Sequence, residues 1–323
     1  MRMLYPAKYQ YDLLVFVVLL CTILLSGCDS LINDLDEDKL PKTVSKLSVA
    51  CYISPQSARY EAIITESRPL LGPAEYDTLF VSDADVFLSD GTSRIQLIYN
   101  DSTFKYVADT STFKVAAGKT YTLTVADGER FVKAQCTVPA KVATITDFVY
   151  EKIPDVFSVR DSVSVIRFSW KDIPNETNFY AIYASATTSI ITLNYNPVTQ
   201  ENYPDKYLYT QRLLYGKETY NDINLDGITF KSPELRIFVP NRYILSYVDR
   251  NGETKTYDNE AHLKEIRAEV LSIDEHYYKF YRSLSNNNDG NPFIEPTLIY
   301  TNVEGGLGCF ASYNAAVAII NPK

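Results

Sequence analysis

One short acidic segment has the spacing of a metal-binding loop. Residues 222–227, Asp-Ile-Asn-Leu-Asp-Gly, place three oxygen-bearing side chains at alternate positions before a glycine. A calcium loop that begins in this way takes a bidentate glutamate from its twelfth position. Here that position is Pro233, and Glu234 comes one residue late. Ile223 and Leu225 also fit a strand that enters a turn, so we favour an Asp-Gly turn and expect no bound metal.

Carboxylates beside histidines form a second group, because such pairs can carry out acid–base catalysis. The sequence has only two histidines, and no nucleophile motif such as G-x-S-x-G accompanies the group. Its acidic members alternate with apolar residues, as on the solvated face of a strand. We therefore expect no enzyme activity and no cofactor. The residues concerned are Glu265, Glu269 and Asp274, with His262 and His276.

A glycine-rich segment, Glu304–Gly308, lacks the lysine and the strand–loop–helix setting of a phosphate loop. Glycine within a strand pair is more typical of a bulge or of a close backbone approach. We therefore expect a bulge or tight turn here.

Tyrosine is unusually common, with 26 residues in a chain of 323. Residues 194–222 are rich in Tyr, Asn, Pro and Gln, and we expect them to form long loops. Exposed aromatic rings on loops can stack on sugars or contact a protein partner. Since tyrosine is common throughout the chain, a place in the core or on a sheet surface is the alternative for several of them. The candidate binding residues are Tyr195, Tyr203, Tyr207, Tyr209, Tyr215 and Tyr220.

The cysteines give no metal-ligand spacing, because Cys51, Cys136 and Cys309 lie far apart in the sequence. Cys51 and Cys136 fall on the apolar sides of two expected strands at opposite ends of the first domain. If those strands are neighbours, a disulfide would close a loop of about 85 residues and add about 4 kcal/mol of stability. Two separate buried thiols are the other reading, and both stay open.

The N-terminus has the pattern of an export signal. Arg2 and Lys8 precede an apolar run, Leu13–Leu25, that leads into Ser26-Gly27-Cys28. The run is shorter than the about 20 residues that a membrane span needs, and no later segment approaches that length. Small residues before a cysteine resemble the bacterial lipobox, in which the thiol accepts a diacylglyceryl group. We expect residues 1–27 to be removed and acyl chains on Cys28 to hold the protein on a membrane. An ordinary cleaved signal and a membrane anchor are the alternatives.

Residues 28–42 form an acidic tether with little to bury. Acidic residues directly behind a lipid-bearing cysteine also resemble the surface-export signals of Bacteroidota lipoproteins, although a plain spacer would have the same composition. The net charge of −9, with no basic stripe, argues against nucleic acid as a partner.

The remaining pattern predicts a mainly β fold: two β-sandwich-like domains in series, with one short C-terminal helix. Residues 43–142 contain about seven short strands separated by turn signals, as an immunoglobulin-like sandwich does. Residues 143–323 form the second β-rich domain. In it, Asp274 is a suitable N-cap for a helix that ends near Leu284.

Several segments of the chain follow one another in a recognisable order. After the lipobox and the tether come Leu47–Ser54, Gly118–Val125, Thr137–Pro139, Tyr277–Leu284, Asn291–Pro296 and Ile299–Phe310. With these segments the chain resembles a family of Bacteroidota outer-membrane lipoproteins of unknown function (domain of unknown function 4249). Cys309 stands where the family pattern has an aliphatic residue.

The resemblance also implies a role and a partner. Members of the family are often encoded beside TonB-dependent transporters of the outer membrane. The resemblance therefore implies a non-enzymatic accessory lipoprotein that faces the cell exterior and has such a transporter as its partner. It names no small-molecule or glycan ligand. A glycan-binding or adhesive surface module and a hydrolase with an unrecognised site are the alternatives.

Overall fold

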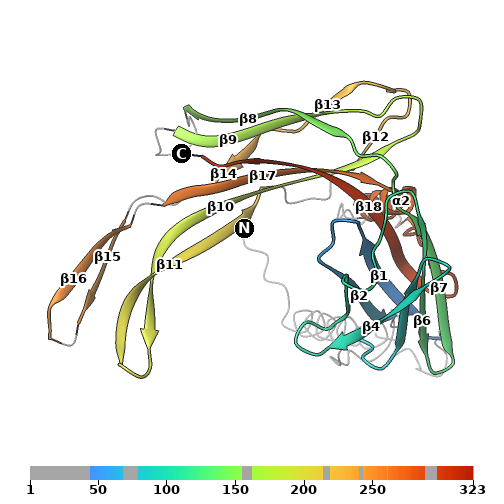
Figure 1. Ribbon diagram of the computed structural model, residues 1–323, viewed down its shortest axis with the longest axis horizontal. Coiled ribbons are helices and arrows are strands. Elements are labelled where there is room, and N and C mark those ends of the chain that lie inside the picture. Colours follow the sequence, from blue (N-terminus) through green and yellow to red (C-terminus); the bar gives the residue numbers. More distant parts are fainter. Residues whose placement is uncertain are drawn as a thin grey trace, which may run out of the picture. The chain divides into compact units, whose positions relative to one another are not determined.

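The computed structural model describes residues 44–67, 79–154, 162–213, 219–239, 243–249, 251–259, 261–287 and 297–322. The predicted signal, Cys28 and the acidic tether lie outside these ranges, as do Tyr215 and the segment 291–296. Within the ranges most residues are in strands, and one helix, α2 (Glu275–Asn286), lies near the C-terminus (Figure 1). The prediction of a mainly β fold with one short C-terminal helix is confirmed. None of the described helical residues belongs to a segment long and apolar enough to cross a membrane.

The first module has the strand arrangement of an immunoglobulin-like sandwich. Strands β1, β2, β5 and β4 pair in that order, as do β3, β6 and β7, and β4 also pairs with β3 and so joins the two groups. The core forms where apolar residues alternate along each strand, as at Leu47, Val49, Cys51 and Ile53. The strands are β1 (Leu47–Ile53), β2 (Arg59–Glu66), β3 (Asp85–Ser89), β4 (Arg94–Asn100), β5 (Lys105–Asp109), β6 (Thr120–Asp127) and β7 (Arg130–Thr137).

The second module packs two sheets face to face. Strands β10 (Phe179–Asn196), β11 (Glu201–Arg212) and β17 (His262–Ile273) belong to one sheet, in which β12 (Thr219–Asn221) also pairs with β10. In the other sheet, β9 (Ser162–Lys171) pairs with β8 (Thr144–Pro154), β13 (Thr229–Lys231) and β14 (Leu235–Ile237). Phe168 and Trp170 of β9 pack with Tyr180 and Ile182 of β10 in the shared core. A separate hairpin joins β15 (Tyr243–Val248) and β16 (Thr254–Asn259).

The C-terminal strand β18 (Leu307–Ile320) belongs to both modules. It pairs with β17 in antiparallel and with β1 in parallel, so one sheet of twelve strands runs through the two modules. Phe310 and Val303 join the core of the first module. The prediction of two domains in series did not include this return of the chain, because a strand pair about 250 residues apart leaves no local signal in the sequence.

The glycine-rich segment forms the turn that leads into β18, as predicted. Glu304 forms an isolated bridge with Lys133, and the Gly306 amide donates to the Val303 carbonyl. Gly308 has a φ of +95°, and a Cβ built on it would lie 2.0 Å from the carbonyl oxygen of Val49. Glycine is therefore required at this position, where β18 comes close to β1.

Candidate functional site

Most of the predicted tyrosine loop is a long β-hairpin. Residues 179–196 and 201–212 are strands β10 and β11, paired from Ser185–Arg212 to Asn196–Glu201, so the prediction of long loops between residues 194 and 222 is wrong. Strand β17 pairs with β10 only as far as Ser189. Beyond that point β11 is the ladder partner of β10, and the hairpin extends past β17 (Figure 1). Residues 205–210 of β11 are all exposed, so both faces of this strand meet solvent. A ribbon exposed on both faces has no apolar–polar alternation, which is why its sequence resembles a loop.

Three of the predicted binding tyrosines share one face of this hairpin. Tyr203, Tyr207 and Tyr209 are separated by even numbers of residues on β11, so their side chains point to the same side. Their exposed fractions are 43%, 53% and 44%. Tyr195, which is 60% exposed, pairs with Asn202 and points to the other face. Aromatic rings this exposed contribute little to the core, and they are available to a partner.

Tyr220 differs from the other tyrosines of this group. Its ring lies 5.1 Å, centroid to centroid, from that of the buried Trp170, in a T-shaped contact. It is half-buried and packs against the core of the second module. This is the alternative that the abundance of tyrosine had left open. Tyr215 lies outside the described residues.

Two side-chain amides hold the base of the hairpin in place. Asn259 is fully buried, accepts from the Ile191 amide at 3.0 Å and donates to the Ile191 carbonyl at 2.6 Å. It thereby continues the ladder of β10 where β17 leaves it. Gln211 makes the same double contact with the backbone of Phe238, at 2.6 and 3.1 Å. Each amide bonds the N–H and the C=O of one residue in a neighbouring segment, and this limits hinge motion of the hairpin.

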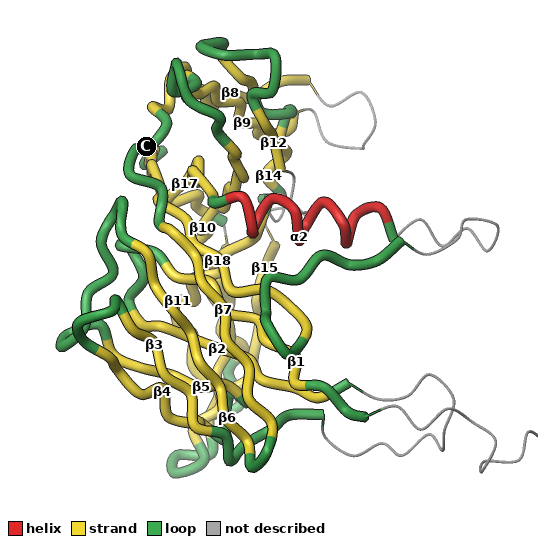
Figure 2. The backbone as a smooth tube through the Cα atoms, turned by 90° about the vertical axis from the view of Figure 1, so that its right-hand side faces the viewer, coloured by secondary structure: helices red, strands yellow, loops and turns green. Residues whose placement is uncertain are grey.

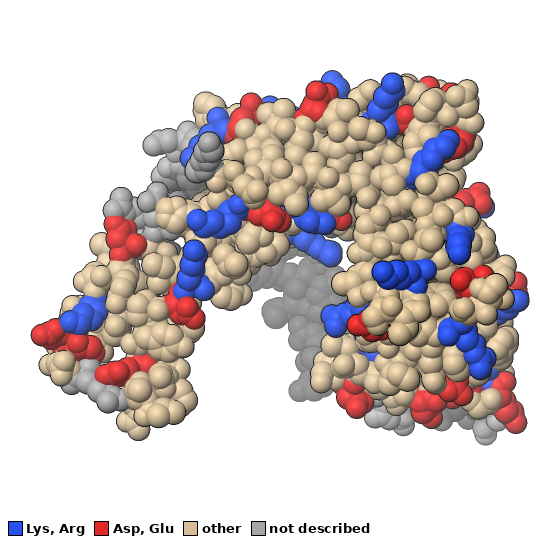
Figure 3. Space-filling model, viewed as in Figure 1, with Lys and Arg blue, Asp and Glu red and all other residues tan. Residues whose placement is uncertain are grey.

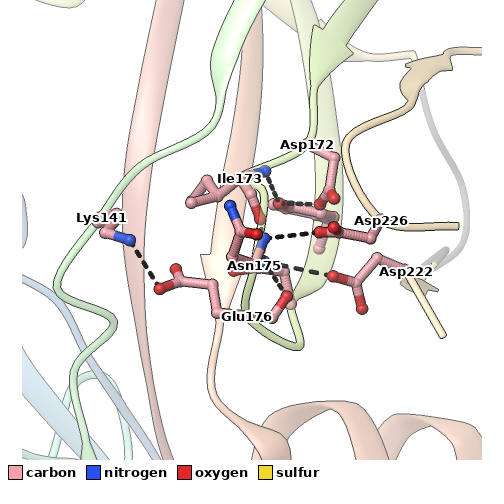
Figure 4. A network of polar contacts seen from close by, with 9 residues as sticks. Lys141, Asp172, Ile173, Asn175, Glu176, Asp222 and Asp226 are labelled. Atoms are coloured by element: carbon pink, nitrogen blue, oxygen red, sulfur yellow. Dashed lines mark hydrogen bonds and ion pairs between the residues drawn. The ribbon is translucent and has the colours of Figure 1, made fainter.

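Three carboxylates meet at the end of β9 (Figure 4). Asp172, Asp222 and Asp226 offer oxygen atoms that lie within 4.8 Å of one another, and the first two residues are buried. Such a group has the chemistry to hold a hard cation, which prefers carboxylate oxygens. Among the residues that the structure describes, no Lys or Arg forms an ion pair with any of the three, and the nearby Lys141 pairs with Glu176 at 2.7 Å.

Each carboxylate of this cluster also has a hydrogen-bond donor within the fold. Asp172 accepts from the Tyr180 hydroxyl at 2.6 Å and from the Gly227 amide at 2.7 Å. Asp226 accepts from the Asn175 amide, and Asp222 from the Asn178 side chain. The predicted Asp-Gly turn is confirmed, since the Ile228 amide donates to the Leu225 carbonyl at 3.3 Å across Asp226 and Gly227. No local pattern indicated Asp172, which lies about fifty positions before the turn.

Helix α2 lies beside strands β18, β12 and β10 (Figure 2). A pocket of about 440 Å³ opens on the face of the β10–β17 sheet that also carries α2. Ser185 of β10 pairs with Arg212 on one side and with Arg267 on the other, so the three residues form a row across three strands. Tyr183 lies two residues before Ser185 on the same face. We call this the tyrosine–arginine pocket; its lining is Tyr52, Tyr183, Ala184, Ser185, Arg212, Arg267, Glu269, Leu271, Tyr277 and Tyr313.

The polar groups of the pocket are ordered by contacts with one another. The Tyr183 and Tyr277 hydroxyls are 2.9 Å apart, and Arg267 Nε lies 2.5 Å from Glu269 Oε1. The Arg212 guanidinium lies 5.9 Å from the centroid of the Tyr183 ring. Burial raises the pKa of Tyr277 and of Tyr52 above the ordinary value, so both hydroxyls stay protonated. No local sequence pattern indicated this pocket.

The residues of the candidate acid–base group lie in separate places. Glu269 lines the tyrosine–arginine pocket, His262 lines a pocket beside the β10–β11 hairpin, and Asp274 and His276 line a third pocket. Asp274 is the N-cap of α2, as predicted: it accepts from the Tyr277 amide at 2.8 Å and from the Ser312 amide and hydroxyl at 2.7 Å. Burial raises its pKa to about 6. Its contacts are those of a residue that fastens the helix to β18.

The cysteines are separate buried thiols. In the structure Cys51 and Cys136 are buried free thiols, as in the second of the two readings, and no disulfide joins them. Cys309 is also buried, and its Sγ lies 3.7 Å from the His276 carbonyl oxygen. Burial raises the pKa of Cys51 to about 12 and that of Cys136 well above its ordinary value. Thiols that remain protonated are poor nucleophiles, and these three fill the core as small apolar groups.

Charge does not single out a nucleic-acid surface. On the face shown in Figure 3, Lys and Arg side chains are interspersed with Asp and Glu, without a large area of one sign. A comparison with curated proteins gives no match. The family model described as a domain of unknown function (DUF4249) matches residues 33–318, which is most of the chain. The chain therefore belongs to the DUF4249 family.

Proposed function

We propose that this protein is a non-enzymatic lipoprotein of the outer membrane that faces the cell exterior and assists a TonB-dependent transporter. The single observation that carries the proposal is the row of exposed tyrosines, Tyr203, Tyr207 and Tyr209, on a hairpin that extends past its neighbouring strand. Tyrosine is enriched at protein–protein interfaces, where its ring buries apolar area and its hydroxyl keeps a polar contact. Rings that served only to fill the core would be buried, whereas these three are exposed.

The membrane anchor makes a small contact sufficient. Acyl chains on Cys28 would confine the protein to the same membrane as its partner, and the effective concentration would then be high. A contact of modest area, without a strongly apolar centre, can be well occupied under these conditions. The tyrosine face of the hairpin has this character, because polar Asp205 lies between Tyr203 and Tyr207 on the same side.

Crosslinking on intact cells tests the partnership. The variant Y203T/Y207T/Y209T keeps β-branched residues on β11 and removes the rings. Its matched control, K206T/L208T, changes exposed residues on the opposite face of the same strand. We expect the wild type and the control to capture a transporter and the triple variant to capture several-fold less. Equal capture by all three would refute the assignment of this face.

Two further measurements test the location. Mass spectrometry of the mature N-terminus should show a diacylglyceryl or triacyl group on Cys28, and C28A should be released from membranes or left unprocessed. Protease added to intact cells should cleave the wild type. If the N-terminus is unacylated, the anchor is refuted. If protease cannot reach the protein and no transporter is captured, a role facing the periplasm replaces the one proposed.

A further inference from the structure

The tyrosine–arginine pocket has the features of a small-molecule site that the proposed accessory role does not use. Its volume of about 440 Å³ lies within the range of small-molecule sites. The residues that line it come from five strands, β1, β10, β11, β17 and β18, and from helix α2, which supplies Tyr277. Side chains from separate elements thus converge on one space, as they do in small-molecule binding sites.

Charge in the pocket favours an anion. Two guanidinium groups and one carboxylate line it, and the carboxylate, Glu269, is held by Arg267. Within the described part of the chain no carboxylate forms an ion pair with Arg212. The lining tyrosines are uncharged, so Arg212 supplies a positive charge that the fold does not neutralise. A planar guanidinium forms two parallel hydrogen bonds with a carboxylate, which gives both strength and orientation.

The sheet register places the two arginines at a suitable separation. Arg212 and Arg267 flank Ser185 on adjacent strands, so their Cα atoms lie about 10 Å apart, twice the spacing between strands. The space above Ser185 is therefore within reach of both side chains. The Tyr183 ring borders this space on one side and is itself covered by the Arg212 guanidinium. An anionic group above Ser185 would meet cations on two sides, with aromatic faces and hydroxyls for the rest of the ligand.

We propose that the tyrosine–arginine pocket binds a small carboxylate-bearing ligand, whose carboxylate lies above Ser185 between Arg212 and Arg267. The body of the ligand packs on the rings of Tyr183 and Tyr313 and forms hydrogen bonds with their hydroxyls. A ligand of this chemistry can be an acidic sugar, whose C–H face stacks on an aromatic ring, or a short peptide with a free C-terminus. The inference does not depend on the lipid anchor or on a transporter.

Ligand-observed NMR titration of the detergent-solubilised full chain tests this proposal with two matched pairs of probes. Digalacturonate is compared with its methyl ester, and N-acetyl-glycyl-tyrosine with its amide. Each pair keeps the shape and removes the charge. We expect at least one acid to bind saturably. Its neutral counterpart should bind at least about tenfold more weakly, because the charge-assisted hydrogen bonds to the guanidinium groups are lost. The acid that binds identifies the source of the carboxylate.

Substitutions then locate the site. R212Q removes the guanidinium that lacks a carboxylate partner, and it should weaken binding of the acid about tenfold while leaving the thermal midpoint within a few degrees. The control is R94Q, because Arg94 also lies over an aromatic ring, at 4.7 Å from the centroid of Phe87, but in the first module. The control should bind as the wild type does. The proposal is overturned if neither acid binds saturably, if a neutral probe binds as well as its acid, or if R212Q and R94Q behave alike.

Discussion

Gly308 is the position at which a single added methyl group should do the most damage. In G308A the new Cβ would lie 2.0 Å from the Val49 carbonyl oxygen and 2.8 Å from the Val49 amide nitrogen. Ordinary contacts of this kind are well above 3 Å, so β1 and β18 would have to separate by more than about 1 Å. The chain offers a matched control, G91A. Gly91 has a similar φ, +90°, and nothing within 4 Å of an added Cβ.

The difference in the free energy of unfolding between the two variants measures the cost of the close approach alone. A side chain at positive φ costs about 1–2 kcal/mol, and both variants bear this cost. G308A also weakens the backbone hydrogen bonds beside the Val49–Gly308 pair, each worth about 1 kcal/mol, and loosens the packing of Phe310 in the first core. We expect G308A to lose about 4 kcal/mol or more and G91A about 1–2 kcal/mol.

Urea denaturation followed by two probes measures these losses. Trp170, the one tryptophan of the chain, lies in the core of the second module, and its fluorescence reports on that module. Far-ultraviolet circular dichroism reports on both modules. Because β18 pairs with strands of both, G308A should lower the midpoint seen by each probe. Equal losses in G308A and G91A would show that strands β1 and β18 are not held at the distance described here.

Three further predictions concern buried polar groups and thiols. Burial raises the pKa of Asp274 to about 6 in the folded protein, above its value in the unfolded chain. Protonation of Asp274 therefore stabilises the folded state; this stabilisation is complete below the unfolded pKa and is lost as the pH rises through 6. The wild type should therefore gain about 1 kcal/mol from this residue between pH 7 and pH 5, and urea denaturation of D274N should lack that slope. N259L leaves both Ile191 backbone groups without their side-chain partner and should cost about 2–4 kcal/mol, with faster hydrogen exchange at Ile191 than in the wild type. A reducing agent should not change the melting temperature, and a thiol count under denaturing conditions should find Cys51 and Cys136 unoxidised.

Local sequence signals predicted those elements whose burial is one-sided. The alternation at Leu47, Val49 and Cys51 predicts a strand because one face of β1 is buried and the other is not. Asp274 predicts the start of α2 because a carboxylate before a helix satisfies a free amide in its first turn. Both signals are contained in a few consecutive residues, and both predictions are confirmed.

Local signals did not predict the outer half of the β10–β11 hairpin, for a physical reason. Its outer half is exposed on both faces, so neither face needs apolar residues, and Asn, Pro and Asp can occupy strand positions. The hairpin is held instead by its ladder and by two side-chain amides that link it to distant segments. Asn259 bonds the backbone of Ile191 in β10, and Gln211 of β11 bonds the backbone of Phe238. Their role depends on contacts that the sequence does not display.

The candidate sites differ in whether their residues are close together in the sequence or only in the fold. The acidic turn is local and visible in the sequence, but its third carboxylate, Asp172, joins it only through the fold. The tyrosine–arginine pocket has no local pattern, because Arg212, Ser185 and Arg267 are brought together by the register of three strands. A shift of one residue in either pairing would turn one arginine to the opposite face. The register, fixed by the buried faces of β10 and β17, therefore determines whether two guanidinium groups meet over one serine.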